Sequence, residues 1–298
     1  MPLVFDSYRT LAKNLGALDG HSASLYLASE YLIEGANEEQ DPQQFGVDLA
    51  KRNNVSTRFL DYDGLPAHLA RLLIVSSYQR SENFFRDFAR EQIAMGNQWK
   101  ERGDKVSPLD HCLSNLPSGL LVNKRKIWKE RYAIHEYYRV LRNSFLHAGA
   151  KDDRLEREFE KVKDLRAFVS ENFQLDAPNE FDNLTFDDHL LFTRVIKYIA
   201  TDVCRLGPPR NHAELLRYIE YACTDEQISR LIALQSKGPH FIASLTTRLR
   251  VRFAFELQKF SNFHEGLSTF FTSLPNKRAR RDLKISAVSS FRALAKEL

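Results

Sequence analysis

Apolar residues recur at helical spacing along almost the whole length of this 298-residue chain. Such spacing is typical of amphipathic helices that bury one face against their neighbours. Only 12 glycines and 10 prolines interrupt the pattern, which is fewer than a protein with many β-turns would need. The sequence therefore predicts an all-α protein.

Composition is that of an ordinary globular protein. Hydrophobic residues make up 43% and charged residues 28% of the chain. The length is sufficient for one large or two ordinary domains. The net charge of +4 is compatible with nucleic-acid binding but does not establish it, because it is small for a chain of this size.

Cysteine usage and hydropathy indicate a cytoplasmic protein. The three cysteines, Cys112, Cys204 and Cys223, are scattered and form no CxxC pair, so we expect neither a disulfide framework nor a thiolate zinc site. The most apolar short run, Leu72 to Val75, is much too short to cross a bilayer. The segment from Met1 to Asp6 lacks the pattern of a secretory signal. We expect no membrane partner.

Breaks in the periodicity predict three regions along the chain. The first, residues 1–62, is an N-terminal helical extension with helices at about 5–17, 21–35 and 43–53. The second, residues 63–207, is a bundle with helices at about 65–95, 124–147 and 153–171, a connector at 97–123, and a last helix after the capping sequence Thr185–Asp188. Gly207-Pro208-Pro209 ends it, and residues 208–298 form a C-terminal helical region.

A short polar motif lies at the end of the helix predicted at 124–147. Arg142 and Asn143 are followed by three residues and then by His147. Histidine moves protons near neutral pH, and arginine holds phosphate through a forked contact. Asn143 can orient either partner by a hydrogen bond. RNA carries its own nucleophile, the 2′-hydroxyl, so metal-independent cleavage needs proton transfer, which histidine suits, and stabilisation of the phosphate charge, which arginine suits.

Helical geometry separates the two ionisable residues of the motif. A turn of about 100° per residue places Arg142 and His147 about 140° apart, so one straight helix does not easily aim both at one phosphate. The helix can unwind near His147, as Gly149 permits. Alternatively, two copies can pair so that the arginine of one approaches the histidine of the other, which predicts a homodimer with a composite active site. Both arrangements stay open.

The pattern Arg-polar-x-x-x-His at the end of a long bundle helix resembles the signature of HEPN domains. Arg142, Asn143 and His147 match it position for position, and the resemblance covers about residues 65–206. It implies a HEPN-like helical bundle with N- and C-terminal helical extensions. Many HEPN proteins are dimeric, metal-independent endoribonucleases of toxin–antitoxin and antiviral systems.

The resemblance implies a role for each motif residue. His147 is expected to be the general acid or base, Arg142 the phosphate clamp and Asn143 the orienting residue. The expected product end is a 2′,3′-cyclic phosphate, and the expected biological role is that of a toxin or an antiviral-defence effector. The expected partners are RNA, a second copy of the chain and a candidate regulatory protein.

Other charged residues are secondary candidates. The basic residues Lys124, Arg125, Lys126 and Arg139 of the same predicted helix are expected to guide an RNA backbone, although a solvated helix face explains them equally well. Glu82 is a candidate for orienting Arg142, with a solvent-facing carboxylate as the simpler interpretation. His135 is more easily explained as a structural histidine than as an RNA contact. No cluster has metal-ligand spacing, so we expect no metal and no cofactor.

A simpler interpretation of the motif competes with catalysis. Arg142 would then be a solvated helix residue, and His147 would stabilise the C-terminal end of the helix dipole. The chain would be a non-catalytic HEPN-like interaction or dimerisation module in a larger defence or nucleic-acid complex.

Overall fold

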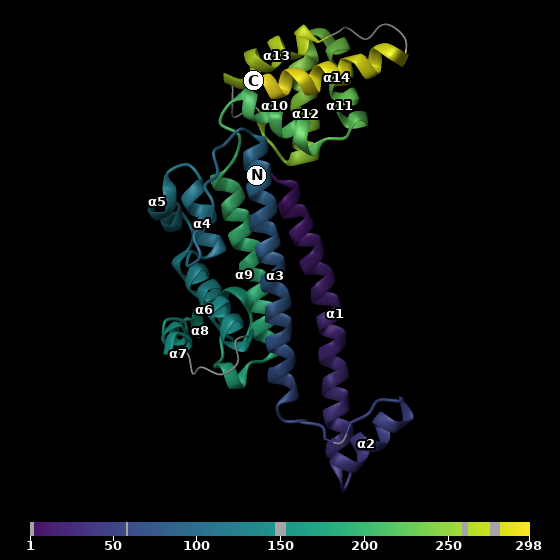
Figure 1. The fold of residues 1–298 in the computed structure, drawn as a ribbon, viewed down its shortest axis with the longest axis vertical. Coiled ribbons are helices and arrows are strands. Elements are labelled where there is room, and N and C mark those ends of the chain that lie inside the picture. The colour runs from purple at the N-terminus through teal and green to yellow at the C-terminus, as the bar shows by residue number, and fades with distance from the viewer. Residues whose placement is uncertain (1–2, 58, 147–152, 258–261, 275–280) are drawn as a thin grey trace. The chain divides into compact units, whose positions relative to one another are not determined.

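The computed structural model describes residues 3–57, 59–146, 153–257, 262–274 and 281–298. All regular secondary structure in these ranges is helical, so the predicted all-α class is confirmed (Figure 1). None of the helices in these ranges is long and apolar enough to span a membrane.

The helices follow one another along the chain with short connectors. Their bounds are α1 (Asp6–Asn37), α2 (Pro42–Arg52), α3 (Leu65–Ala94), α4 (Pro108–Asn115), α5 (Gly119–Lys126), α6 (Lys129–Leu146), α7 (Asp153–Glu160), α8 (Arg166–Phe173), α9 (Phe186–Leu206), α10 (His212–Ala222), α11 (Asp225–Ala233), α12 (Phe241–Phe253), α13 (Asn262–Ser273) and α14 (Arg281–Glu297). Short 3₁₀ helices lie at Lys163–Leu165, Phe181–Asn183 and Leu234–His240.

The chain divides into two compact units that do not coincide with the predicted regions. Unit 1 comprises Met1–Thr10, Asn83–Lys126 and Ala200–Leu298, and unit 2 comprises Leu11–Glu82 and Ile127–Ile199. Helices α1, α3 and α9 each contribute residues to both units. No glycine or proline lies at the points where these three helices pass from one unit to the other. The apolar periodicity is therefore continuous there, and the predicted boundaries lie at residues 62 and 207 instead.

Aromatic packing forms the core of unit 2. Tyr78 of α3 stacks on Phe192 of α9, with ring centroids 6.4 Å apart, and Tyr138 of α6 lies 5.0 Å from the same ring. Tyr78 and Tyr138 are 3% and 0% exposed, so all three helices bury their apolar stripes here. Burying such rings contributes about 2 kcal/mol each and fixes α6 against α3 and α9.

A buried carboxylate ties the beginning of α9 to α6. Asp188 is fully buried and accepts hydrogen bonds from the Tyr138 hydroxyl (2.8 Å), the Thr185 amide (2.8 Å) and both nitrogens of Asn179 (2.9 Å each). Burial raises the pKa of Asp188, although these hydrogen bonds act in the opposite direction. The predicted capping sequence therefore does more than begin α9, because it also holds the preceding loop and α6.

Several predicted helix boundaries are wrong. Residues 6–37 form one helix where two were predicted, because Gly20 costs a helix interior only about 1 kcal/mol and did not break it. The expected connector at 97–123 contains α4 and the beginning of α5. The helix predicted at 124–147 is two helices, since Ile127 and Trp128 separate α5 from α6.

Unit 1 buries a carboxylate in its own aromatic core. Phe5 lies 5.0 Å from Phe88 and 5.1 Å from Tyr218, measured between ring centroids. Beside them Glu91 is 2% exposed, and both the amide and the hydroxyl of Ser7 donate to its carboxylate. Burial raises the pKa of Glu91 to about 7 in spite of these hydrogen bonds.

We predict that this carboxylate makes unit 1 less stable as the pH rises. A raised pKa gives stability that is fully present below the unfolded value of 4.5 and is lost as the pH rises through about 7. Relative to Glu91→Gln, the wild type should lose on the order of 3 kcal/mol of unfolding free energy across this window. Urea unfolding at a series of pH values measures the difference, and parallel curves for the two proteins would contradict the prediction.

Candidate functional site

The first two residues of the sequence motif lie in the last turn of α6. Helix α6 ends at Leu146, so Arg142 and Asn143 belong to its final turn. The stripe of Ile134, Tyr138 and Leu141, each fully buried, fixes this turn against the core of unit 2. The third motif residue, His147, lies outside the described residues.

Arg142 is held by three neighbouring groups. Its Nη1 donates to Oδ1 of Asn143 at 2.9 Å, and its Nη2 lies 3.9 Å from Oε2 of Glu82. The guanidinium carbon is 5.2 Å from the centroid of the Tyr78 ring, in cation–π range. Burial raises the pKa of Tyr78 well above its usual range, and the Glu82 charge adds to the effect, so the ring stays neutral. The Arg142 side chain keeps 21% of its surface exposed.

Asn143 and Glu82 therefore differ in how strongly they orient Arg142. The asparagine makes a direct hydrogen bond across adjacent positions of α6. At 3.9 Å the carboxylate of Glu82 is at the outer limit of an ion pair, and both side chains are partly exposed. Such a pair contributes less than about 1 kcal/mol. Glu82 lies close enough to Arg142 to orient its guanidinium, and this role stays a prediction.

Two residues at the beginning of α3 also meet the end of α6. The ring of His68 lies edge-on to Phe145, with centroids 5.6 Å apart. The guanidinium of Arg71 lies 5.9 Å from the Phe145 ring and 4.7 Å from that of Phe181. Sequence reasoning missed this pair. Their three-residue spacing on one helix face was the available signal, but nothing in the sequence showed that this face meets Phe145.

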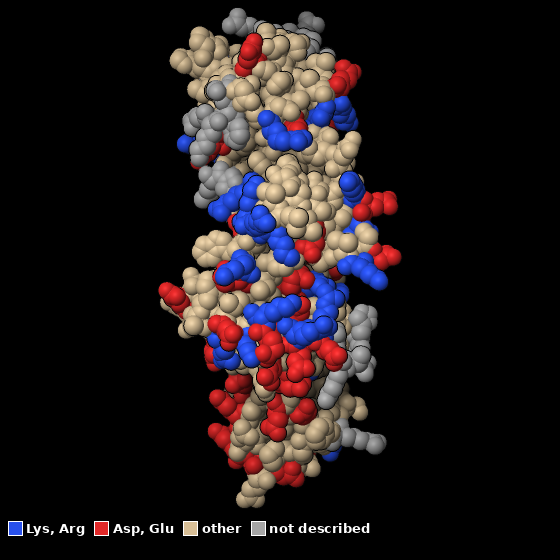
Figure 2. Space-filling view, turned by 90° about the vertical axis from the view of Figure 1, so that its left-hand side faces the viewer, with Lys and Arg blue, Asp and Glu red and all other residues tan. Residues whose placement is uncertain are grey.

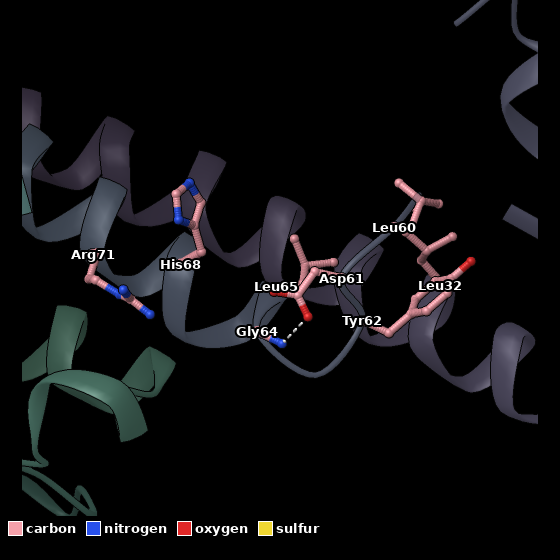
Figure 3. A pocket seen from close by; sticks show the side chains of 8 residues that line it. All are labelled: Leu32, Leu60, Asp61, Tyr62, Gly64, Leu65, His68 and Arg71. Carbon is pink, nitrogen blue, oxygen red and sulfur yellow. Dashed lines mark hydrogen bonds between the residues drawn. The ribbon is translucent and has the colours of Figure 1, made fainter. Parts of the chain in front are cut away.

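His68 and Arg71 also line a pocket of about 470 Å³ (Figure 3). The remaining walls come from α1, from the segment before α3 and from the first residue of α3, namely Leu32, Leu60, Asp61, Tyr62, Gly64 and Leu65. Oδ1 of Asp61 accepts from the amide of Gly64 at 2.9 Å, and the hydroxyl of Tyr62 donates to the carbonyl of Pro42 at 2.9 Å. These bonds fix the polar part of the wall.

The predicted basic residues do not share one helix. Lys124, Arg125 and Lys126 are exposed in the last turn of α5, which belongs to unit 1, and not on the motif helix as predicted. Figure 2 shows lysine and arginine side chains on the face that carries α5. Their expected role in guiding RNA along the motif helix loses its premise, because Ile127 and Trp128 separate the two helices.

Arg139 is on α6 and is largely buried. It is only 9% exposed, and its Nε and Nη2 donate to the carboxylate of Glu136 at 2.8–3.1 Å. The RNA-binding role of Arg139 stays a prediction, and the structure shows its guanidinium already engaged by Glu136. Glu136 lies one turn earlier on the inward side of the helix, and a buried guanidinium needs such a partner.

His135 lies in the core of unit 2, as expected for a structural histidine. It is fully buried, and its Nδ1 lies 3.6 Å from Oε1 of Glu136. An RNA contact by His135 is excluded by this burial. In the parts of the chain that the structure describes, no three histidine, cysteine or acidic side chains come together as metal ligands.

No family model, curated protein or solved structure matches this chain. The HEPN resemblance thus stays a prediction that depends on the motif residues themselves.

We predict that the pair of Glu136 and Arg139 stabilises unit 2 and is lost in acid. Burial alone would raise the pKa of Glu136, but the nearby His135 and the hydrogen bonds from Arg139 lower it from 4.5 to about 2. Glu136→Gln should lower the free energy of unfolding by about 3 kcal/mol at neutral pH, because it leaves Arg139 buried without its counter-charge.

The lowered pKa of Glu136 stabilises the folded protein above about pH 4.5, and this stabilisation is lost as the pH falls toward 2. The free energies of unfolding of the wild type and Glu136→Gln should therefore converge over that pH range. Chemical unfolding followed by circular dichroism measures both effects. Glu130→Gln is the control, because Glu130 pairs at 3.8 Å with a Lys129 side chain that is 92% exposed. Equal stability of wild type and Glu136→Gln at neutral pH would refute the assignment.

Proposed function

We propose that this chain is a metal-independent endoribonuclease of HEPN type. The observation that carries the proposal is the hydrogen-bonded pair of Arg142 and Asn143 in the last turn of α6, the helix that directly precedes His147 in the sequence. The guanidinium is fixed by its neighbours and still partly open to solvent, as a phosphate clamp requires. A cytoplasmic location and a toxin or antiviral-defence role belong to the same proposal, and the latter comes from the resemblance alone.

The reaction uses the nucleophile that RNA supplies. The 2′-oxygen forms a bond to the adjacent phosphorus while the bond from phosphorus to the 5′-oxygen breaks. His147 takes the proton of the 2′-hydroxyl or delivers a proton to the leaving 5′-oxygen. Arg142 binds the non-bridging oxygens, whose charge rises in the transition state, and Asn143 keeps the guanidinium in place. The products are a 2′,3′-cyclic phosphate and a 5′-hydroxyl, and no water is consumed.

Residues on α3 support this location for the site. Phe145 contacts His68 and Arg71, which adds a second arginine to the same end of α6. His147 follows Phe145 by two residues in the sequence, a separation that covalent geometry limits to about 7 Å between Cα atoms. One histidine fills one proton-transfer role, so a homodimer in which a second copy supplies the other histidine is part of the proposal.

A non-catalytic interaction or dimerisation module is the second candidate. The observation in its favour is that Nε of Arg142 is buried without an acceptor among the described residues, while its guanidinium packs on Tyr78. An arginine with that environment also suits a purely structural role. Under this alternative the protein binds its partners and leaves RNA intact.

We predict that His147→Ala and Arg142→Ala each lower the rate of RNA cleavage by about a hundredfold or more, since each removes one catalytic group. The measurement is the decay of labelled total RNA with purified protein in the presence of a chelator. Arg90→Ala is the control, because the Arg90 side chain is 62% exposed and its ion pair with Asp87 lies at the surface.

Circular dichroism and gel filtration establish that each variant keeps its fold and its oligomeric state. Undiminished cleavage by both folded variants would contradict the catalytic assignment. Stable RNA binding without cleavage by the wild type would favour the interaction module.

A further inference from the structure

The pocket that His68 and Arg71 line has different chemistry at its two ends. The basic end carries these two residues on α3, and the apolar end carries Leu32, Leu60 and Tyr62, with Asp61 between the two (Figure 3). Its volume of about 470 Å³ is within the range of about 300–1,000 Å³ that small-molecule sites occupy. A ligand that fits must therefore be anionic at one end and apolar or aromatic at the other.

Arg71 is equipped to bind an oxyanion. Its Nε donates to the carbonyl of Ala67 at 3.1 Å, which leaves the two Nη groups as the available edge of the fork. None of the residues that the structure describes accepts a hydrogen bond from these Nη groups or places a carboxylate within 4.0 Å of them. The guanidinium also contacts the rings of Phe145 and Phe181, and these contacts restrict its position while the Nη edge stays available to an oxyanion.

His68 adds a second group at the basic end. It is exposed, and its ring is fixed edge-on to Phe145. Within the described part of the chain its ring nitrogens have no hydrogen-bond partner. It can therefore donate to an oxyanion at the basic end of the pocket.

The opposite end of the pocket suits a planar base. Tyr62 is half-buried, and the hydrogen bond from its hydroxyl to Pro42 fixes the orientation of its ring. The wall behind Tyr62 is tightly packed, because a Cβ at Gly46 of α2 would approach the Tyr62 hydroxyl to 2.4 Å and Leu60 to 2.6 Å. Stacking of a base on such an aromatic ring contributes about 1–3 kcal/mol and depends little on the base.

Asp61 sets the direction of binding. One of its oxygens accepts from the amide of Gly64, and this acidic side chain lines the pocket wall. A phosphate next to this charge would be repelled, so the phosphate is directed to Arg71 and the base to Tyr62.

We propose that this pocket binds one nucleotide of single-stranded RNA, with its phosphate on Arg71 and His68 and its base on Tyr62, as a substrate subsite that depends on the proposed RNA function. Continuity with the motif supports RNA over a free nucleotide. Arg71 and His68 contact Phe145, which precedes His147 by two residues in the sequence. A nucleotide in the pocket would thus flank the phosphate that is cut.

The test is binding of a fluorescent single-stranded RNA oligonucleotide with 2′-O-methyl riboses, measured by anisotropy on the full-length protein. The methyl group blocks the nucleophile, so binding is measured apart from cleavage. Arg71→Ala and Tyr62→Leu should each weaken binding by about tenfold, and Arg71→Lys should restore only part of the loss because an ammonium lacks the fork. Arg90→Ala should bind like the wild type.

Thermal unfolding of each variant establishes that it is folded at the assay temperature. Failure of the wild type to bind the oligonucleotide, or unchanged binding by folded Arg71→Ala and Tyr62→Leu, would overturn the subsite. Binding of adenosine monophosphate that depends on Arg71, without any such effect on the oligonucleotide, would assign the pocket to a free nucleotide. Binding of a phosphopeptide in place of RNA would overturn it as well.

The two proposals fail in different ways. If the wild type does not cleave RNA but binds the blocked oligonucleotide in a way that depends on Arg71, the nuclease proposal is contradicted and the subsite proposal stands. If the wild type cleaves RNA but Arg71→Ala binds the blocked oligonucleotide as tightly as the wild type, only the subsite proposal is contradicted.

Discussion

The contact of α6 with α3 and α9 determines where every candidate residue of unit 2 lies. Tyr138 of α6 packs on Phe192 and donates to the buried carboxylate of Asp188, while Phe192 stacks on Tyr78 of α3. One turn beyond Tyr138, the same helix directs Arg142 toward Tyr78 and Glu82. The aromatic core therefore contributes to the stability of unit 2 and determines the environment of Arg142, its candidate phosphate clamp. Substitutions in this core should alter the position of Arg142 even where the substituted residue does not contact it.

The arginines of unit 2 divide according to how completely the fold neutralises them. Arg139 is buried and bound by Glu136, which gives it a structural role. Arg142 donates a hydrogen bond to the neutral amide of Asn143, and the nearest carboxylate, that of Glu82, is 3.9 Å away. Arg71 donates to a backbone carbonyl and contacts two aromatic rings. Charges that are oriented but not neutralised are suited to an external anion. Arg71 and Arg142 are two arginines of this kind that lie around the last turn of α6, which is why we assign RNA chemistry to that end of the helix.

The all-α class followed from periodicity, because amphipathic helices are encoded locally. The continuity of α1 through Gly20 did not, since a glycine costs a helix little compared with packing. The burial of Arg139 depends on which side of α6 meets its neighbours, and that is a tertiary property. The same is true of His68 and Arg71, whose meeting with Phe145 joins segments far apart in the chain. The motif residues were accessible to sequence reasoning because they are contiguous.

The chemistry of the cut ends tests the central claim most directly. An RNA oligonucleotide with a single 2′-deoxy nucleotide, incubated with the wild type in a chelator and analysed by mass spectrometry, reports which bonds break and what the ends carry. Our account predicts 2′,3′-cyclic phosphate and 5′-hydroxyl ends, with no cut at the linkage that follows the deoxy position. Cleavage at that linkage, or ends with a 3′-hydroxyl and a 5′-phosphate, would contradict it.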